Sequence, residues 1–451
     1  MEKSSDPLLL NSQERADTST YLSKCQVDTP EPLVRLVWRL VNARRPNAGE
    51  VVDFGCGDAR FANAGAYTRY TGYEIDASRI RKPADVRCKI RNKSAFESSP
   101  SQSRYLTSIG NPPYVRHHEL SAEWLERAHE RLGKIDGYRP DGRSNAYVYF
   151  MWLAIDSVQD DGLVALVVPY EWVSRPASRH LRKFIEDRGW RVDVYYLPEA
   201  GFKRVLTTAC ITVIDKSATD EGWHLHEISS DGASSRTRSH VTRTAHRRLD
   251  YQRAATSIRA LRGLSPGGQD AFVLTEAMRI KYRLVEGRDV VPAVTSFRHL
   301  DANTKVLDRQ TFRDEFINKG RRCWLVNCVG KPSAALQSYL DKVPMEVRET
   351  YTCRVRDVWW KYRVPPAAEI LYSSGFKGKR PKLVRNSVGA VHVGAVHAIY
   401  ADKKAQATSL LQHLHSFDFG SKVVPMANGF LKIEVNQMNA VLNSLTRTLS
   451  T

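Results

Sequence analysis

Three features that mark other classes of protein are missing from the 451-residue sequence. The best apolar run, Gly162–Pro169, is far shorter than the roughly 20 residues that a helix needs to span a bilayer, so no membrane partner is expected. The seven cysteines form no CxxC pair and the histidines show no ligand spacing, which argues against a disulfide framework and a metal site. The polar segment Met1–Lys24 lacks the basic-then-apolar order of a signal peptide. These absences predict a cytoplasmic protein without a metal.

Acidic residues are scarce relative to basic ones: 49 Asp and Glu face 68 Lys and Arg, for a net charge of +19. The excess is concentrated in two stretches. Between Arg236 and Arg262 there are eight arginines and one acid, and the stretch Arg354–Arg385 holds nine Lys or Arg, two acids and five aromatic residues. Cations mixed with aromatic rings suit a nucleic-acid surface, although a solvated basic face beside core aromatics has the same composition. The charge balance predicts a polyanionic partner.

The first half of the sequence alternates between strand and helix patterns. Thr29 is placed to cap a helix that begins near Glu31. Further helices are expected at Ala146–Gln159 and Arg179–Glu186, and strands at Glu50–Phe54, Tyr70–Asp76, Tyr105–Ile109, Gly162–Pro169, Val192–Leu197 and Ala209–Asp215. This alternation predicts an α/β fold with a doubly wound parallel sheet, whose ligands bind at the carboxyl ends of the strands.

A glycine-rich turn, Asp53-Phe54-Gly55-Cys56-Gly57, follows the first of these strands. Such a turn lets the backbone approach a ligand closely, although many are only tight structural turns. Glu74 ends the next strand, where its carboxylate can accept hydrogen bonds from both ribose hydroxyls. Ala59 stands where a dinucleotide fingerprint has another glycine, which disfavours a pyrophosphate. A nucleoside without phosphates fits better, and S-adenosyl-L-methionine (AdoMet) is the common one.

The most specific feature is Asn111-Pro112-Pro113-Tyr114, directly after a predicted strand. Two prolines fix the backbone, so that the Asn111 side-chain oxygen and the Pro112 carbonyl can face one point. Two acceptors at one point suit an NH2 group, because accepting both hydrogens localises the nitrogen lone pair for attack on a methyl sulfonium. Tyr114 would stack on the planar group that carries this nitrogen. The alternative is a rigid turn with an incidental tyrosine.

Taken together, these motifs resemble the DNA adenine-N6 methyltransferases of the gamma arrangement, the TaqI-like type II restriction-modification family, over roughly residues 25–220. Segments Ser144–Tyr147, Leu163–Pro169 and Gly201–Val205 continue the resemblance in the family's order. The resemblance implies catalytic roles for Asn111, Pro112, Tyr114 and Phe202. It implies cofactor contacts for Thr29, Asp53, Phe54, Gly55, Cys56, Gly57, Glu74, Ile75, Asn92 and Pro113. Two positions depart from the pattern: Ala59 replaces the usual last glycine of the loop, and Asn92 stands where the family has an acid.

The resemblance also implies the organisation of the chain. We expect a polar tail at 1–24, a Rossmann-like class I AdoMet-dependent methyltransferase domain at 25–230, a basic linker at 231–262 and a mixed α+β target-recognition domain at 263–451. The expected substrate is an adenine flipped out of double-stranded DNA. Expected DNA contacts are Lys203, Arg204, Arg354, Arg356, Lys361, Arg363, Lys377, Lys379, Arg380 and Lys382.

No nuclease carboxylate cluster is recognised, so a separate restriction endonuclease is the expected functional partner, and the protein is expected to act as a monomer. Three other functions share part of the pattern. A protein glutamine-N5 methyltransferase uses the same Asn-Pro-Pro-Tyr logic, but it lacks a basic C-terminal domain. The net positive charge does not distinguish an RNA adenine methyltransferase from one that acts on DNA. A catalytically silent fold that binds DNA is disfavoured by the intact motif.

Overall fold

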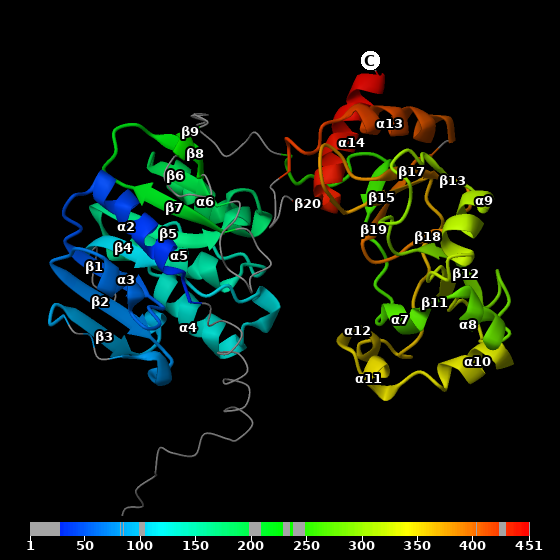
Figure 1. Cartoon of the computed structure of the whole chain (residues 1–451), viewed down its shortest axis with the longest axis horizontal. Helices are drawn as coiled ribbons and strands as arrows, with labels where there is room; N and C mark the ends of the chain where they lie inside the picture. Colours follow the sequence, from blue (N-terminus) through cyan, green and yellow to red (C-terminus); the bar gives the residue numbers. More distant parts are fainter. Residues whose placement is uncertain are drawn as a thin grey trace, which may run out of the picture. The chain divides into compact units, whose positions relative to one another are not determined.

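The computed structural model describes residues 28–81, 83, 85–98, 104–197, 209–228, 235–237, 249–402, 404–423 and 430–450. The chain divides into two compact units (Figure 1). The first comprises Met1–His246 with Met426–Asn428, and the second comprises Arg247–Pro425 with Gly429–Thr451. No helix in these described ranges is long and apolar enough to cross a membrane.

Nine described strands form the sheet of the first unit, in the order β3-β2-β1-β4-β5-β7-β6-β8-β9. The strands are β1 Glu50–Phe54, β2 Arg69–Glu74, β3 Cys88–Asn92, β4 Tyr105–Gly110, β5 Val158–Pro169, β6 Arg191–Tyr196, β7 Ala209–Asp215, β8 Gly222–Ile228 and β9 Ser235–Thr237. The first five strands pair in parallel, and β7 runs antiparallel between β5 and β6. The carboxyl ends of β1 to β5 therefore meet at one edge.

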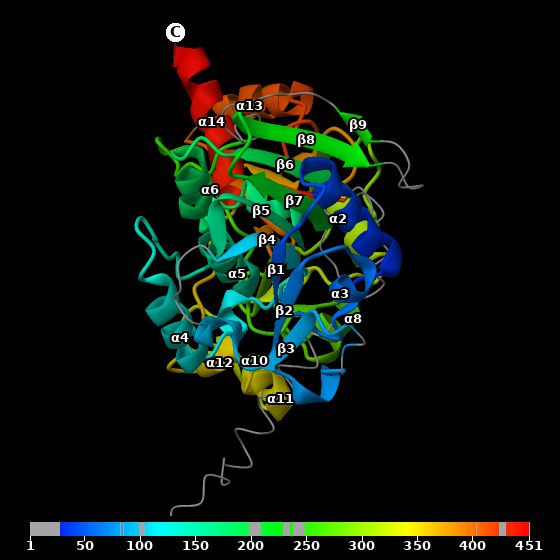
Figure 2. The same ribbon diagram turned by 90° about the vertical axis from the view of Figure 1, so that its left-hand side faces the viewer.

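Helices cover both faces of this sheet. The longer helices are α2 Glu31–Arg44, α3 Arg60–Ala64, α4 Ala122–Leu132, α5 Ala146–Ser157 and α6 Arg179–Glu186. In Figure 2, α2 and α3 lie to one side of the sheet and α4, α5 and α6 to the other. All but one of the α5 side chains are buried, so this helix is apolar around its whole circumference. It packs between the sheet and the aromatic residues of α4 and α6, including Trp124 and Phe184.

The predicted doubly wound α/β sheet is confirmed. The bounds of β1, β7 and α6 are those predicted, while β2 ends at Glu74 and β5 begins earlier, at Val158. The prediction missed β3, α4, β8 and β9. The prediction that Thr29 caps α2 was wrong, because Pro30 occupies the cap position and no side chain caps the helix.

The second unit is a mixed α+β domain, as predicted. Its described strands form a five-stranded sheet, β10-β19-β15-β17-β13, a four-stranded sheet, β11-β14-β12-β18, and a two-stranded pair, β16-β20. The strands are β10 Arg259–Leu261, β11 Val273–Leu274, β12 Val290–Val294, β13 Val306–Leu307, β14 Trp324–Val326, β15 Ile370–Ser373, β16 Gly375–Phe376, β17 Leu383–Asn386, β18 Val391–His392, β19 Val396–Tyr400 and β20 Leu431–Lys432. The helices are α7 Gln269–Phe272, α8 Glu276–Lys281, α9 Arg309–Phe312, α10 Ala334–Leu340, α11 Met345–Arg348, α12 Tyr351–Arg354, α13 Lys404–Ser416 and α14 Val435–Ser450.

Both ends of the segment predicted as a basic linker, 231–262, are in strands. Strand β9 pairs with β8 of the first unit, and β10 pairs with β19 of the second. The side chain of Asn439 on α14 also accepts a hydrogen bond from the Ala260 amide. The ordered part of the second unit therefore begins before residue 263.

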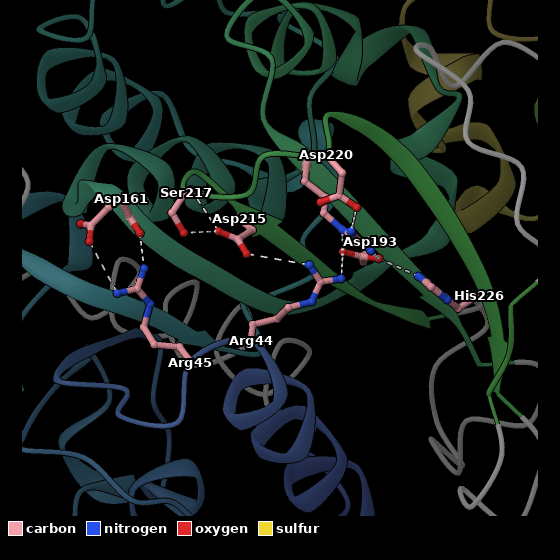
Figure 3. Close-up of polar contacts among 9 residues, drawn as sticks. Arg44, Arg45, Asp161, Asp193, Asp215, Ser217, Asp220 and His226 are labelled. Atoms are coloured by element: carbon pink, nitrogen blue, oxygen red, sulfur yellow. Dashed lines mark hydrogen bonds and ion pairs between the residues drawn. The ribbon is translucent and has the colours of Figure 1, made fainter.

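A buried ion-pair network fastens the end of α2 to the sheet of the first unit (Figure 3). The Asp193 side chain is fully buried and accepts hydrogen bonds from Arg44 at 2.6 Å, Arg191 at 2.8 Å and His226 at 2.7 Å. Burial alone would raise the pKa of Asp193. The hydrogen bonds from His226 and Arg191 and the charge of Arg44 outweigh it and lower the pKa to about 2. Asp193 is therefore ionised throughout the neutral range.

Replacing Arg44 by methionine is expected to lower the free energy of unfolding of the first unit by about 2 kcal/mol, because a buried carboxylate loses one of its two arginine partners. Arg35→Met is the matched control, since Arg35 lies on the same helix in an exposed pair with Glu31 and should cost less than about 0.5 kcal/mol. Urea denaturation followed by circular dichroism measures both. Equal effects of the two substitutions would contradict a stabilising role of the network.

Candidate active site

The glycine-rich turn after β1 is held by the end of β2. Gly55 and Gly57 adopt positive φ angles of 86° and 57°, which side chains disfavour. The Gly55 amide donates to the Tyr73 carbonyl at 2.8 Å, and the Gly57 amide donates to Glu74 Oε2 at 2.8 Å. Glu74 Oε1 accepts from the Asp76 amide at 2.9 Å. These contacts fix the Glu74 carboxylate at the carboxyl edge of the sheet, beside the turn.

Ala59, one of the two departures from the family pattern, adopts the left-handed conformation that glycine favours. Its φ is 60° and its ψ is 30°, and its methyl group is buried in the core beneath α2. A left-handed alanine costs roughly 1 kcal/mol relative to glycine. The loop thus keeps a left-handed turn without the glycine.

Ile75 and Asn92 extend the site along the same edge. The Asn92 amide nitrogen donates to the Glu74 carbonyl at 2.9 Å and to the Ile75 carbonyl at 3.1 Å. This arrangement leaves the Asn92 side-chain oxygen as the group that can accept a hydrogen bond from a ligand. The Ile75 side chain is 54% exposed, which is unusual for a large apolar residue beside a sheet. A carboxylate, an exposed apolar side chain and an amide oxygen therefore follow one another along this edge.

The other three residues of the turn, Asp53, Phe54 and Cys56, are buried. Asp53 is buried, accepts a hydrogen bond from the Tyr70 hydroxyl at 2.6 Å, and has one oxygen without a hydrogen-bond partner in the described chain. Burial raises the pKa of Asp53 to about 7. The hydrogen bond from Tyr70 lowers this pKa and the charge of Glu74 raises it, but both effects are smaller than that of burial. Burial also raises the pKa of the Cys56 thiol, with Asp53 and Glu74 adding to the effect, so Cys56 stays protonated and is no nucleophile. Phe54 packs against Tyr73.

The Asn111 side chain presents an oxygen that has no partner. Its amide nitrogen donates to the hydroxyl of Thr29 at 3.0 Å, and its buried oxygen has no hydrogen-bond partner among the described residues. A buried acceptor without a donor costs free energy, so it marks a position where a ligand NH group would be stabilised. Pro113 lies 3.6 Å from the point where a Gly55 side chain would begin, so the two motifs adjoin.

Tyr114 is held at two points. Its hydroxyl donates to the Val167 carbonyl on β5 at 2.9 Å, and its ring meets the Tyr147 ring edge to face with centroids 6.2 Å apart. Burial raises the pKa of Tyr114 well above its usual value, so the hydroxyl remains a donor. Asn145 accepts a hydrogen bond from the His117 amide at 3.0 Å. The segment Ser144–Tyr147 therefore braces the loop that carries Tyr114.

The hydrogen bond between Thr29 and Asn111 was not predicted from the sequence, because the two residues are 82 positions apart. Thr29→Val keeps the size of the side chain but removes the acceptor, which frees the Asn111 amide to rotate. We expect the methyl transfer that the sequence resemblance implies to slow by about 10- to 100-fold, because one hydrogen bond that orients the predicted catalytic side chain is lost. Thr29→Ser should retain most activity. Single-turnover rates at saturating cofactor separate this effect from weaker cofactor binding, and an unchanged rate in the valine variant would contradict it.

The basic residues predicted to contact DNA fall into three groups. Lys203 and Arg204 lie outside the described residues, as does Phe202, the second predicted stacking residue. Exposed side chains in the second unit are Arg354, Lys361, Arg363, Lys377, Lys379 and Arg380. Arg356 donates to the Pro266 and Trp359 carbonyls, and Lys382 donates to the Leu300 carbonyl, so these two side chains hold the domain's own backbone.

The aromatic residues of the segment Arg354–Arg385 belong to the core. Tyr372 and Phe376 are buried, and Trp359, Trp360 and Tyr362 are partly buried against the main apolar cluster of the second unit. Of the two interpretations that the composition left open, the structure agrees with core aromatics beside a basic face. They are interleaved with basic residues because the chain alternates between core and surface.

Comparisons with known proteins relate segments of the chain to restriction-modification methyltransferases. Residues 69–197 match the family described as Eco57I restriction-modification methylase, and residues 235–417 match the C-terminal domain of type II methyltransferase M.Eco57I. Type II methyltransferase M.TthHB8I of Thermus thermophilus is 30% identical over 40% of this chain and 43% of its own length. Type II methyltransferase M.XamI of Xanthomonas campestris pv. amaranthicola is 22% identical over 83% of this chain and 76% of its own length.

A solved structure shows the same fold over most of the chain. The type IIL restriction-modification enzyme MmeI, solved in complex with DNA, superposes with a TM-score of 0.55 at 10% identity over 88% of this chain and 63% of its own. The first unit has the fold of the class I AdoMet-dependent methyltransferases, as predicted. Two segments of the chain therefore match families of restriction-modification methylases, and the relatives named above are type II methyltransferases.

Proposed function

We propose that the protein transfers a methyl group from AdoMet to the N6 amino group of an adenine that is flipped out of duplex DNA. The observation that carries this proposal is the unpartnered Asn111 oxygen, which lies beside a turn and a carboxylate suited to a nucleoside. M.TthHB8I and M.XamI are named as type II methyltransferases, and MmeI was solved with DNA, which supports DNA as the substrate.

The cofactor would supply an electrophilic methyl group when bound. Glu74 would hold the ribose hydroxyls of the cofactor. Ile75 and the Asn92 oxygen would contact its adenine ring, and the turn Asp53–Gly57 would hold its amino-acid part. The residues next to these cofactor-binding groups would complete the site: Thr29, Phe54, Cys56 and Pro113. The left-handed glycines of the turn and the exposed Ile75 fit a planar nucleoside without phosphates.

At the target base, the Asn111 oxygen and the Pro112 carbonyl would accept the two amino hydrogens. Accepting both hydrogens keeps the nitrogen lone pair out of the ring and directs it at the methyl group. Positioning and lone-pair localisation supply the rate, without a covalent intermediate. Tyr114 would stack on one face of the base and Phe202 on the other, which offsets the cost of extrusion.

The proposal also includes a separate restriction endonuclease as the functional partner and a monomeric state. The test of the activity uses labelled AdoMet with purified protein and duplex DNA, RNA or a protein rich in glutamine as acceptor. We expect label in duplex DNA, recovered as N6-methyladenine after hydrolysis. Label in RNA or protein alone, or in another base, would contradict the proposal. Methylation-sensitive sequencing of host DNA would then identify the recognition sequence.

A further inference from the structure

A group of basic side chains in the first unit lies outside every segment predicted to bind DNA. It consists of Arg139, Arg143, Arg179 and His180, and we call it the rim cluster. The three arginines are exposed, and His180 is half-buried. They come from two segments: the loop between α4 and α5, and the start of α6.

The members of the rim cluster lie near one another and near the carboxylate of Asp141. Arg143 donates to both Asp141 oxygens at 3.2 and 3.3 Å, and Arg179 donates to the His180 ring at 3.2 Å. Burial would raise the pKa of Asp141, but Arg143 and the charge of Arg179 lower it. Burial and the charges of Arg179 and Arg139 lower the pKa of His180. The cations are thus close enough to act on the same groups, and their charges exceed that of Asp141.

Hydrogen bonds connect the two segments to each other and to the catalytic motif. The Ser144 hydroxyl donates to the Ala177 carbonyl at 2.9 Å, which joins the loop before α5 to the turn before α6. The next residue, Asn145, holds the His117 amide, three residues after Tyr114. The rim cluster therefore flanks the loop that carries the stacking tyrosine.

We propose that the rim cluster binds phosphates of the DNA strand beside the flipped adenine; the inference rests on the proposed function. Extruding a base requires the backbone on either side of it to be held, and exposed guanidinium groups bind phosphate with paired donors. Such contacts give affinity without base specificity. They place part of the grip on DNA in the catalytic unit, in addition to that expected from the second unit.

The test compares Arg143→Gln/Arg179→Gln with wild type in duplex-DNA binding from 50 to 300 mM salt. Each lost phosphate contact lowers the slope of log affinity against log salt by about 0.9. We expect the slope to fall by about 2 and the dissociation constant near 150 mM salt to rise about 30-fold. Lys183→Gln is the matched control, because Lys183 is one turn further along α6 and pairs with Asp187. It should leave the slope unchanged.

AdoMet binding should be unaffected in all of these variants, which shows that the fold is intact. An unchanged salt slope in the double variant would overturn the role of the rim cluster alone. A wild-type protein that binds AdoMet but transfers no methyl group to duplex DNA would instead overturn the proposed function.

Discussion

Asn111→Ala is expected to slow methyl transfer to duplex DNA by about 100- to 1,000-fold, the usual loss when one preorganised hydrogen-bonding group is removed from a reaction site. The Asn111 oxygen is buried and has no hydrogen-bond partner in the described part of the chain, so its hydrogen-bonding capacity is available to the substrate. AdoMet affinity should change little, because Glu74 and the turn after β1 are held by contacts that do not involve Asn111. Single-turnover transfer at saturating DNA and cofactor measures the effect.

Asn47→Ala provides a control of the same chemistry. Its oxygen accepts from the Gly49 amide at 3.0 Å in the loop before β1, at the opposite end of that strand from the site. Its transfer rate should stay close to wild type. A similar decrease in both variants would mean that the loss in Asn111→Ala comes from general destabilisation, and wild-type activity in Asn111→Ala would contradict the proposed mechanism.

Acidification from pH 7.5 to pH 5 is expected to destabilise the second unit by about 4 kcal/mol through two buried histidines. His392 and His397 are 1% and 4% exposed, and burial lowers the pKa of each to about 4 from an ordinary value of 6.5. Glu434 opposes this effect at His397. Because the unfolded chain takes up the protons first, stability is fully present above pH 6.5 and is lost as the pH falls toward 4.

The measurement is the urea midpoint of the full chain at pH 7.5 and at pH 5. In His392→Phe/His397→Phe the difference between the two midpoints should shrink, because phenylalanine keeps a ring beside Tyr400 and Tyr372 but binds no proton. The exposed residue His299 offers the control, since His299→Phe should leave the difference as in wild type. A pH response that persists in the double variant would rule out these histidines as its source.

The central strands of the first unit and the loop after Asn111 could be predicted from short sequence patterns. The apolar strands β1, β5 and β7 and the two prolines after Asn111 fix their own conformation over a few residues. In contrast, β3 is Cys-Lys-Ile-Arg-Asn, and only Cys88 within it is fully buried, so it carries little strand signal. The bond between Thr29 and Asn111 depends on how distant segments pack, which no local pattern encodes.

Composition was a poorer guide in the second unit. The segment around Trp359 and Tyr362 has the composition of a nucleic-acid surface, yet its rings pack against the core. Arg356 lies over the Tyr362 ring and donates to the Trp359 carbonyl. The rim cluster gave no compositional signal, since Arg139, Arg143 and Arg179 are spread over two segments that only the fold brings together. The grouping of these arginines becomes visible only in the folded structure, not in the sequence.

The hydrogen bond between Thr29 and Asn111 also bears on how the protein can be shortened. A truncation that begins at Glu31 would retain α2 and every strand of the sheet, and with them the buried contacts of the core. It would remove the acceptor that orients the Asn111 amide. Such a shortened protein should fold and bind DNA, but it should transfer methyl groups slowly and bind the cofactor less tightly, because Thr29 is also a predicted cofactor contact. DNA-binding assays alone would overlook the defect.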